Sequence, residues 1–205
     1  IPQVVGLPDI ASNANSLNVR VVGDQIDSYK YKLGSAVDLD CSVNDGYSSS
    51  TDSIKMVDNS LANFGQVRLR LCVVARDRAG NWTNYANAYS YDWERDTVAP
   101  RLSISGQPTN SSAQVRIPLE IGPRAVGLRE NIFQYRWKIG MKSETDCTVL
   151  TGYSSPKSVD ESTTVDLTSL SDGDIRLCAF GRDRAGNWQS LSQSTEASWT
   201  KVPLN

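Results

Sequence analysis

The sequence predicts an all-β protein of two β-sandwiches, one in each half of the chain and each closed by one intradomain disulfide. The first observation is an internal repeat, because the seven residues Arg76–Trp82 recur unchanged at Arg182–Trp188, 106 positions later. The second is an alternation of apolar and polar residues with a period of two, which is typical of strands, without a helical stripe of useful length. The third is that each half carries one pair of cysteines, separated by 31 residues in both.

The repeat extends well beyond the seven-residue motif. The matching segments, first half before second, are Tyr29–Gly34 and Tyr135–Gly140, Cys41 and Cys147, Gly46–Ser49 and Gly152–Ser155, Cys72 and Cys178, and Trp93 and Trp199. One module of about 100 residues is therefore present twice, and each copy is long enough to bury a modest core. We expect a first domain at 1–95, a linker at 96–100 and a second domain at 101–205. Because the chain starts at Ile1 without a signal peptide, we also expect it to be a segment of a longer protein.

The first strands follow the alternation in chain order. Residues 16–22 predict a strand with three apolar side chains on one face. Residues 29–33 predict a second strand, which turns aromatic and aliphatic side chains inward and Lys30 and Lys32 outward. A shorter and weaker strand is expected at 53–57.

The clearest strand is 67–75, in which every second residue is apolar and is expected to face the core. The intervening residues, Cys72 and Val74 among them, are expected on the opposite face, as are Cys178 and Phe180 in the second copy. The Ala-Gly-Asn sequence that follows supplies residues that tolerate positive φ, so a tight turn is expected there. A last strand follows in each copy and ends near the repeated tryptophan.

About seven short strands per module, with turn signals between them, form the pattern of an immunoglobulin-like sandwich. The order of motifs runs from an aromatic-rich strand through cysteine, GYSS, a second cysteine and RDRAGNW to a Thr-x-Ala-Pro linker. This order resembles tandem immunoglobulin-like repeats of bacterial cell-surface and secreted proteins of the adhesin type. The resemblance covers nearly the whole chain. It implies the fold more specifically than the function, because such repeats serve as stalks, adhesin segments and accessory modules.

The four cysteines predict two disulfides, Cys41–Cys72 and Cys147–Cys178, and hence an oxidising compartment. On the chain-entropy model, closing loops of this length stabilises each domain by roughly 3–4 kcal/mol. The alternative is free buried thiols in a cytosolic protein. Strand parity puts Cys72 and Cys178 on the face opposite the core. Each bridge is therefore expected to fasten the loop after the aromatic-rich strand to the outer face of the sheet.

Composition argues against several functions. The chain has no histidine, which weakens Ser-His-Asp and Cys-His catalysis and the commonest transition-metal sites. The net charge is −2 without a long run of one sign, which predicts no nucleic-acid footprint. No apolar run approaches the ~18 residues of a spanning helix. We therefore expect no enzyme, no cofactor, no metal, no nucleic-acid partner and no membrane insertion.

Asp77 and Asp183 of the repeated motif have two interpretations. One assigns them to calcium, with Glu94 or Asp96 contributing across the linker. Hard cations need several converging carboxylates, however, and the sequence offers only scattered ones. The interpretation that we favour is that each aspartate accepts hydrogen bonds from the backbone of its own turn.

Trp82 and Trp188 follow the same turn in the two copies. A tryptophan there can stack on a sugar or hold a partner, but its presence in both copies favours packing, as a lid over one end of each sandwich. If the first domain binds a ligand or partner at its loop tips, the candidate contacts are Asp24, Asp27, Asn81 and Trp82.

The five-residue linker predicts a small junction between the domains. The residues expected there are Asp96, Pro100, Val126, Leu128 and Trp188. Pro100 stiffens the connection, because it fixes φ and removes an amide. We expect Val126 and Leu128 to be buried against the first domain, giving an extended and fairly rigid rod.

Two functions fit these observations. The first is a non-enzymatic extracellular interaction or stalk segment of a bacterial surface adhesin-like protein. Its partners would be a protein or glycan on another cell surface and neighbouring repeats of the same chain. The second is an accessory module, carbohydrate-binding or spacer, of a secreted hydrolase. Both predict an extracellular, cell-surface or periplasmic location. Further repeats and a surface anchor in the parent protein would favour the first function, and a neighbouring catalytic domain would favour the second.

Overall fold

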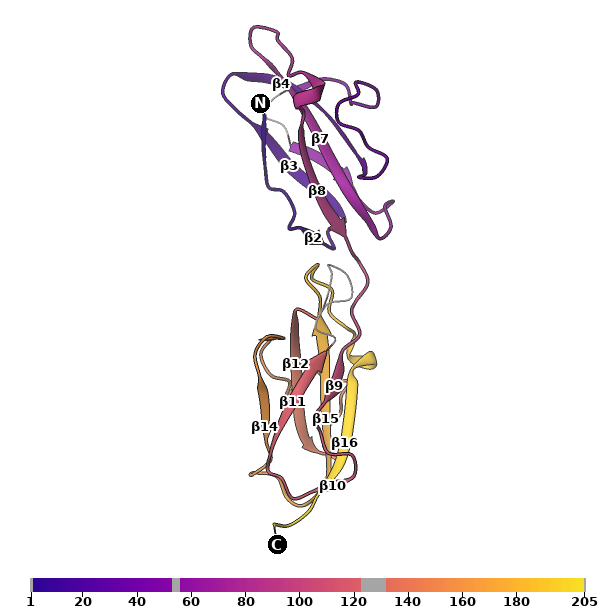
Figure 1. Ribbon diagram of the computed structural model, residues 1–205, viewed down its shortest axis with the longest axis vertical. Coiled ribbons are helices and arrows are strands. Elements are labelled where there is room, and N and C mark those ends of the chain that lie inside the picture. The colour runs from indigo at the N-terminus through magenta and orange to yellow at the C-terminus, as the bar shows by residue number, and fades with distance from the viewer. Residues whose placement is uncertain (1, 53–55, 123–131, 205) are drawn as a thin grey trace. The chain divides into compact units, whose positions relative to one another are not determined.

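The computed structural model describes residues 2–52, 56–122 and 132–204. The chain divides into two compact units, Ile1–Thr97 and Val98–Asn205, which we call domain one and domain two. Each domain is a sandwich of a three-stranded and a five-stranded sheet (Figure 1). The predicted all-β class, with two tandem sandwiches and one disulfide in each, is confirmed.

In domain one the sheets have the strand orders β1-β3-β6 and β2-β8-β7-β4-β5. The elements are β1 (Gln3–Val5), β2 (Ala11–Ser12), β3 (Ser16–Val22), β4 (Ile26–Ser35), β5 (Thr51–Asp52), β6 (Met56–Ser60), β7 (Val67–Asp77), the 3-10 helix η1 (Tyr85–Asn87) and β8 (Tyr89–Arg95). The strand expected at 53–57 falls partly outside the described residues.

Domain two repeats this arrangement with the orders β14-β11-β9 and β10-β16-β15-β12-β13. The elements are β9 (Ser103–Ser105), β10 (Ser111–Ser112), β11 (Arg116–Gly122), β12 (Gln134–Met141), β13 (Lys157–Ser158), β14 (Thr163–Asp166), β15 (Gly173–Arg182), the 3-10 helix η2 (Leu191–Gln193) and β16 (Thr195–Lys201). The two domains therefore share one topology, strand for strand.

Each core lies between the two sheets, and the predicted alternation places it. In β3 the residues Leu17, Val19 and Val21 are buried and their neighbours on the other face are exposed. Strand β7 contributes Leu69, Leu71, Val73 and Ala75, and β8 contributes the fully buried Trp93.

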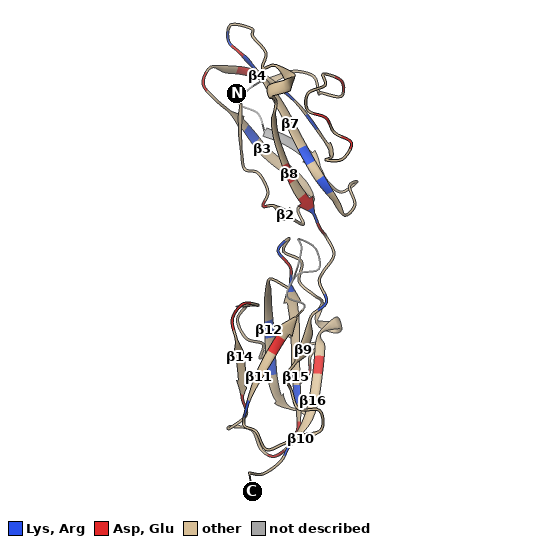
Figure 2. Cartoon of the chain, viewed as in Figure 1, with Lys and Arg blue, Asp and Glu red and all other residues tan. Residues whose placement is uncertain are grey.

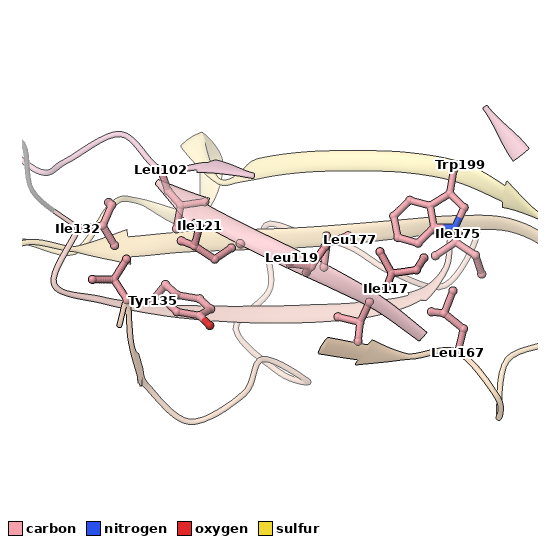
Figure 3. Close-up of a cluster of buried hydrophobic side chains, with 13 residues drawn as sticks. Leu102, Ile117, Leu119, Ile121, Ile132, Tyr135, Leu167, Ile175, Leu177 and Trp199 are labelled. Carbon is pink, nitrogen blue, oxygen red and sulfur yellow. The ribbon is translucent and has the colours of Figure 1, made fainter. Parts of the chain in front are cut away.

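The core of domain two is built in the same way (Figure 3). Ile117, Leu119 and Ile121 of β11 lie against Ile175 and Leu177 of β15. Trp199 and Leu167 close one end of this core, while Leu102, Ile132 and Tyr135 close the other. Trp93 and Trp199 therefore occupy equivalent core positions in the two domains.

The chain enters and leaves each five-stranded sheet through a parallel pair of strands. Strand β2 pairs with β8, and β10 pairs with β16, whereas the other strand pairs within the described residues are antiparallel. Because β2 and β10 consist of two residues each, the parallel pairs are short.

The outer face of each five-stranded sheet differs from the expectation. Cys72, Val74, Cys178 and Phe180 lie opposite the core as predicted, yet all four are buried, and so is Lys32. The reason is that the loop after β4, residues 36–50, folds back over this face instead of leaving it to solvent. The expectation that each disulfide fastens this loop to the outer face is confirmed, and alternation assigned the residues to the correct face. Alternation alone did not show that the loop buries them.

Candidate functional site

The repeated Arg-Asp-Arg-Ala-Gly-Asn-Trp motif forms the turn after β7 and after β15. The Asp77 carboxylate accepts hydrogen bonds from the backbone amide of Asn81 at 2.8 Å and from its side-chain amide at 3.0 Å. Gly80 takes a φ of 94°, a value that glycine adopts at little cost. The bonds from Asn81, its side chain first, lower the pKa of Asp77 below the usual range. The carboxylate thus stabilises its own turn.

Domain two builds the same turn with tighter burial. The Asp183 carboxylate accepts from the amides of Gly186 and Asn187 at 2.8 Å each, and from the side chain of Asn187 at 2.8 Å. Asp183 is buried, and its turn is completed by Gly186 at a φ of 102°. Both copies therefore have the geometry of the turn-stabilising interpretation.

The calcium interpretation required further carboxylates near this turn. Glu94 instead lies in β8, and the buried Asp96 donates its backbone amide to the Ser12 carbonyl at 3.1 Å. Within 2–52, 56–122 and 132–204, no group of three or more acidic or cysteine side chains is placed to hold a metal ion.

Trp82 and Trp188 pack on their own domains, but not as lids over the sandwich ends. The Trp82 ring lies 4.8 Å from the Lys30 ammonium and 5.8 Å from the Arg76 guanidinium, measured to the ring centroid. The Trp188 ring lies 5.2 Å from the Phe180 ring. Because Lys30 and Phe180 stand on the outer faces of their sheets, each tryptophan covers that outer face. The two tryptophans therefore pack on their own domains, as expected, but on the outer face of the sheet and not over the sandwich end. Cation–π contacts strengthen this packing.

A cavity of about 620 Å³ opens at the loop end of domain one. Three of the four predicted contacts line it, namely Asp24, Asn81 and Trp82. Asp27 does not line it. This carboxylate pairs instead with the Arg76 guanidinium at 2.5 Å and thereby braces the cavity wall. The structure thus brings the loop after β3 and the turn after β7 together around one space.

The structure also reveals a clamp that the alternation did not predict. It consists of the disulfide Cys41–Cys72 together with Lys32 and Tyr47, all on the outer face of β4 and β7. The Lys32 ammonium donates to the carbonyls of Val43 at 2.9 Å and Asp45 at 3.2 Å. It also lies 4.6 Å from the centroid of the Tyr47 ring, whose hydroxyl donates to the Cys41 carbonyl at 2.9 Å. A buried cation is thus satisfied entirely by backbone oxygens and an aromatic face.

The clamp is repeated in domain two. Lys138 donates to the carbonyls of Val149 and Thr151, at 2.6 and 3.2 Å, and lies 4.5 Å from the Tyr153 ring centroid. The Tyr153 hydroxyl donates to the Cys147 carbonyl at 2.9 Å. The signal was present in the sequence, because Lys, Gly-Tyr and both cysteines occupy equivalent positions in the two copies.

Burial in this clamp has an electrostatic consequence for Tyr47. Desolvation, with the neighbouring Tyr85 and Asp40, raises the pKa of Tyr47 to about 12. The rings of Tyr47 and Tyr85 lie 5.1 Å apart between centroids. The phenol therefore remains neutral, and remains a hydrogen-bond donor to Cys41, throughout the physiological range.

The predicted junction residues fall into two groups. Asp96 and Pro100 are buried, and Trp188 is engaged by Phe180 and Arg136 of its own domain. Val126 and Leu128 lie outside the described residues, so their burial stays a prediction. The described part of the chain includes no helix of the length and apolarity needed to cross a membrane.

Comparison with known proteins places the fold. No family model matches the chain, and no curated protein matches it. Among solved structures, the FN1–FN3 domains of chicken CNTN1 superpose with a TM-score of 0.50 at 9% sequence identity, covering 93% of this chain and 64% of that one. Both domains have an immunoglobulin-like fold.

Two further solved structures resemble the tandem immunoglobulin-like domains at lower scores. A tetra-tandem repeat in the extending region of a large adhesion protein is 16% identical, with a TM-score of 0.35, and covers 98% of this chain and 48% of that one. The BSP domain of a biofilm-associated protein is 10% identical, with a TM-score of 0.30, and covers 98% of this chain and 29% of that one. The chain therefore spans less than two thirds of the length of each of these three structures.

Proposed function

We propose that the chain is a non-enzymatic extracellular stalk or interaction segment of a bacterial surface adhesin-like protein. Its two disulfides are typical of proteins made in an oxidising compartment. The motif order resembles tandem repeats of bacterial surface proteins, and the fold is that of such repeats. Its partners would be a protein or glycan on another cell surface and neighbouring repeats of the same chain.

The observation that carries the proposal is the parallel pairing of the first and last strands of each five-stranded sheet. In domain one, the amides of Glu94 and Asp96 donate to the carbonyls of Ile10 and Ser12 at 2.8 and 3.1 Å. In domain two, the amides of Thr200 and Val202 donate to Asn110 and Ser112 at 2.8 and 3.1 Å. The same two bonds thus join the entry and exit strands of both copies.

This geometry suits a segment that carries tension. Pulling on the two ends of a domain draws β2 and β8 in opposite directions along their length, because the strands are parallel and lie near opposite ends of the domain's chain. Their hydrogen bonds are then loaded together in shear and must break together. An antiparallel pair at the same place would open one bond at a time. A stalk between a cell and its target needs the first kind of resistance.

Single-molecule force extension tests the proposal on the whole chain. Val202 directly follows β16, and its amide donates to the carbonyl of Ser112 in β10. Val202→Pro removes this amide, and Val202→Ala is the matched control that keeps it. We expect the proline variant to lower the unfolding force of one of the two domains and to leave the other unchanged. If both variants unfold at the force of the native chain, the parallel pair bears no load and the stalk proposal loses its support.

A further inference from the structure

The loop end of domain one differs from that of domain two, although the two domains share a topology. In domain two, Leu102 and Ile132 are buried at this end of the core (Figure 3). The Gln189 side chain accepts hydrogen bonds from the amides of Leu102 at 3.3 Å and Gly181 at 3.4 Å, so it ties the start of β9 to the end of β15. Among the described residues of domain two, Leu102 and Gln189 line a cavity of about 640 Å³ together with residues 98–101, Gln193 and Thr195, so the lining at this end differs from that of domain one.

Domain one has other residues at three of the four equivalent positions. Pro2 replaces Leu102 and has no amide to donate, and Thr83 replaces Gln189 and bonds only to Ala75 of β7, at 3.1 and 3.4 Å. Ala75 replaces Gly181, where a Cβ atom would collide with the Ile132 side chain. The residue equivalent to Ile132 is Ile26, which is only half-buried.

In domain one the cavity of about 620 Å³ is lined by Pro2, Ala75 and Thr83 of these positions, and its walls are held in place. Gln25 lies at a φ of 57°, a strained value for a residue with a side chain, and the Arg78 amide holds its carbonyl at 3.0 Å. The Asp27–Arg76 pair and the Asp77 turn fix the opposite wall. A site whose loops are already fixed loses little entropy when it binds a ligand.

The lining of the cavity defines what it can hold. The side chains of Gln3, Asp24 and Gln25 line it, and within the described residues none of the three has a hydrogen-bond partner. The two side-chain amides can donate to and accept from hydroxyl groups, and the carboxylate can accept from them. Trp82 also lines the cavity, and the parts of its ring that Lys30 and Arg76 do not cover can pack against C–H groups.

We infer that this cavity binds a neutral saccharide, an inference that rests on the proposed extracellular interaction role. Its volume lies in the range of small-molecule sites, and a mostly polar lining with one tryptophan suits a hydroxyl-rich ligand better than an apolar one. An acidic sugar is disfavoured, because Arg76 is paired with Asp27 while the Asp24 carboxylate is free. Along the described part of the chain, residues of both signs occur in both domains (Figure 2).

The test is an NMR titration of the whole chain with the methyl glycosides of glucose, galactose, mannose and N-acetylglucosamine, each at millimolar concentration. At least one should shift the signals of the Trp82 indole and the Gly23–Ile26 backbone. Asp24→Ala and Gln25→Gly should each weaken binding by about tenfold, the cost of one lost hydrogen bond of about 1.4 kcal/mol. Both residues are exposed, and glycine relieves the φ of Gln25, so both variants should fold.

The matched control is Trp188→Leu, which should leave binding unchanged, whereas Trp82→Leu should abolish it. Undiminished binding by Asp24→Ala, binding that survives Trp82→Leu, or no binding of any of the four glycosides would overturn the inference. So would a shift of the same signals by lysine methyl ester alone, because the site would then recognise a cation. Loss of this inference would leave the force measurements on the Val202 variants untouched, so the two proposals fail separately.

Discussion

Replacing Lys32 by methionine should destabilise domain one far more than the same replacement of Lys30, which lies two residues earlier in β4. Lys32→Met removes two charge-assisted hydrogen bonds, to Val43 and Asp45, and a cation–π contact with Tyr47. Part of this loss is offset, because a buried ammonium no longer has to be desolvated and both carbonyls can turn to water. The net cost should be about 2 kcal/mol.

Lys30→Met is the matched control. Lys30 is half-exposed and contacts the Trp82 ring at 4.8 Å, so its loss should cost roughly 0.5–1 kcal/mol. For a domain of this size each kcal/mol corresponds to a shift in Tm of roughly 4–8 °C. Lys32→Met should therefore lower the Tm of domain one by about 8–16 °C, and Lys138→Met should do the same for domain two. Lys32→Arg should not restore stability, because a planar guanidinium does not fit a cage made for a compact ammonium.

Urea unfolding gives the free energies, and peptide-resolved hydrogen exchange assigns the loss to one domain. The 36–50 loop should lose protection in Lys32→Met, while residues 142–156 should keep it. If Lys32→Met and Lys30→Met differ by less than about 0.5 kcal/mol, within the usual effect of a surface change, the clamp does not hold the loop as argued.

Three other outcomes follow from the same contacts. In a tyrosinate absorbance titration, Tyr47→Phe should remove the step at the highest pH, because the pKa of Tyr47 is raised to about 12. The stability that the neutral Tyr47 contributes should be fully present below pH ~10, the ordinary tyrosine pKa, and be lost as pH rises through the folded pKa of about 12. The pKa of Asp77 is lowered, so its contribution to the free energy of unfolding should be present above the usual pKa of Asp and be lost as pH falls through the folded pKa. The free energy of unfolding, measured across an acid pH series, should therefore depend less on pH in Asp77→Asn. Under force, reducing the disulfides should lengthen each unfolding step by about 100 Å, because it frees 31 residues at ~3.4 Å each, whereas equal steps would mean that the bridges do not close these loops.

The fold could be predicted from the sequence because the signals were redundant. The period of two in β7 and β15 assigned each residue to the correct face, and the repeat showed which features both domains share. The cysteine pairs placed a loop on the outer face, but the alternation could not show how completely that loop buries it, because the period gives the direction of a side chain and not what lies above it. Lys32 and Cys72 therefore read as outward-facing and are in fact buried.

The candidate site was predicted less completely, for a related reason. Asp24, Asn81 and Trp82 could be named as loop-tip contacts, because a sandwich gathers its loops at its two ends. The lining of the cavity differs from domain two at the positions of Leu102, Gly181 and Gln189, and the meaning of these three replacements appears only when their contacts are known. No local sequence pattern shows that the Cβ atom of Ala75 stands where Gly181 of domain two leaves room for the Ile132 side chain.

The division of roles between the copies follows from which contacts they share. The turn, the disulfide clamp and the parallel terminal strands occur in both domains, and on the stalk proposal these shared features are the ones that resist unfolding or stretching. The copies diverge at the loop end, and divergence there changes the cavity without touching the bonds between the parallel terminal strands. A repeat built in this way can carry tension in every copy while one copy recognises a ligand, because the two properties depend on different residues at different places in the sandwich.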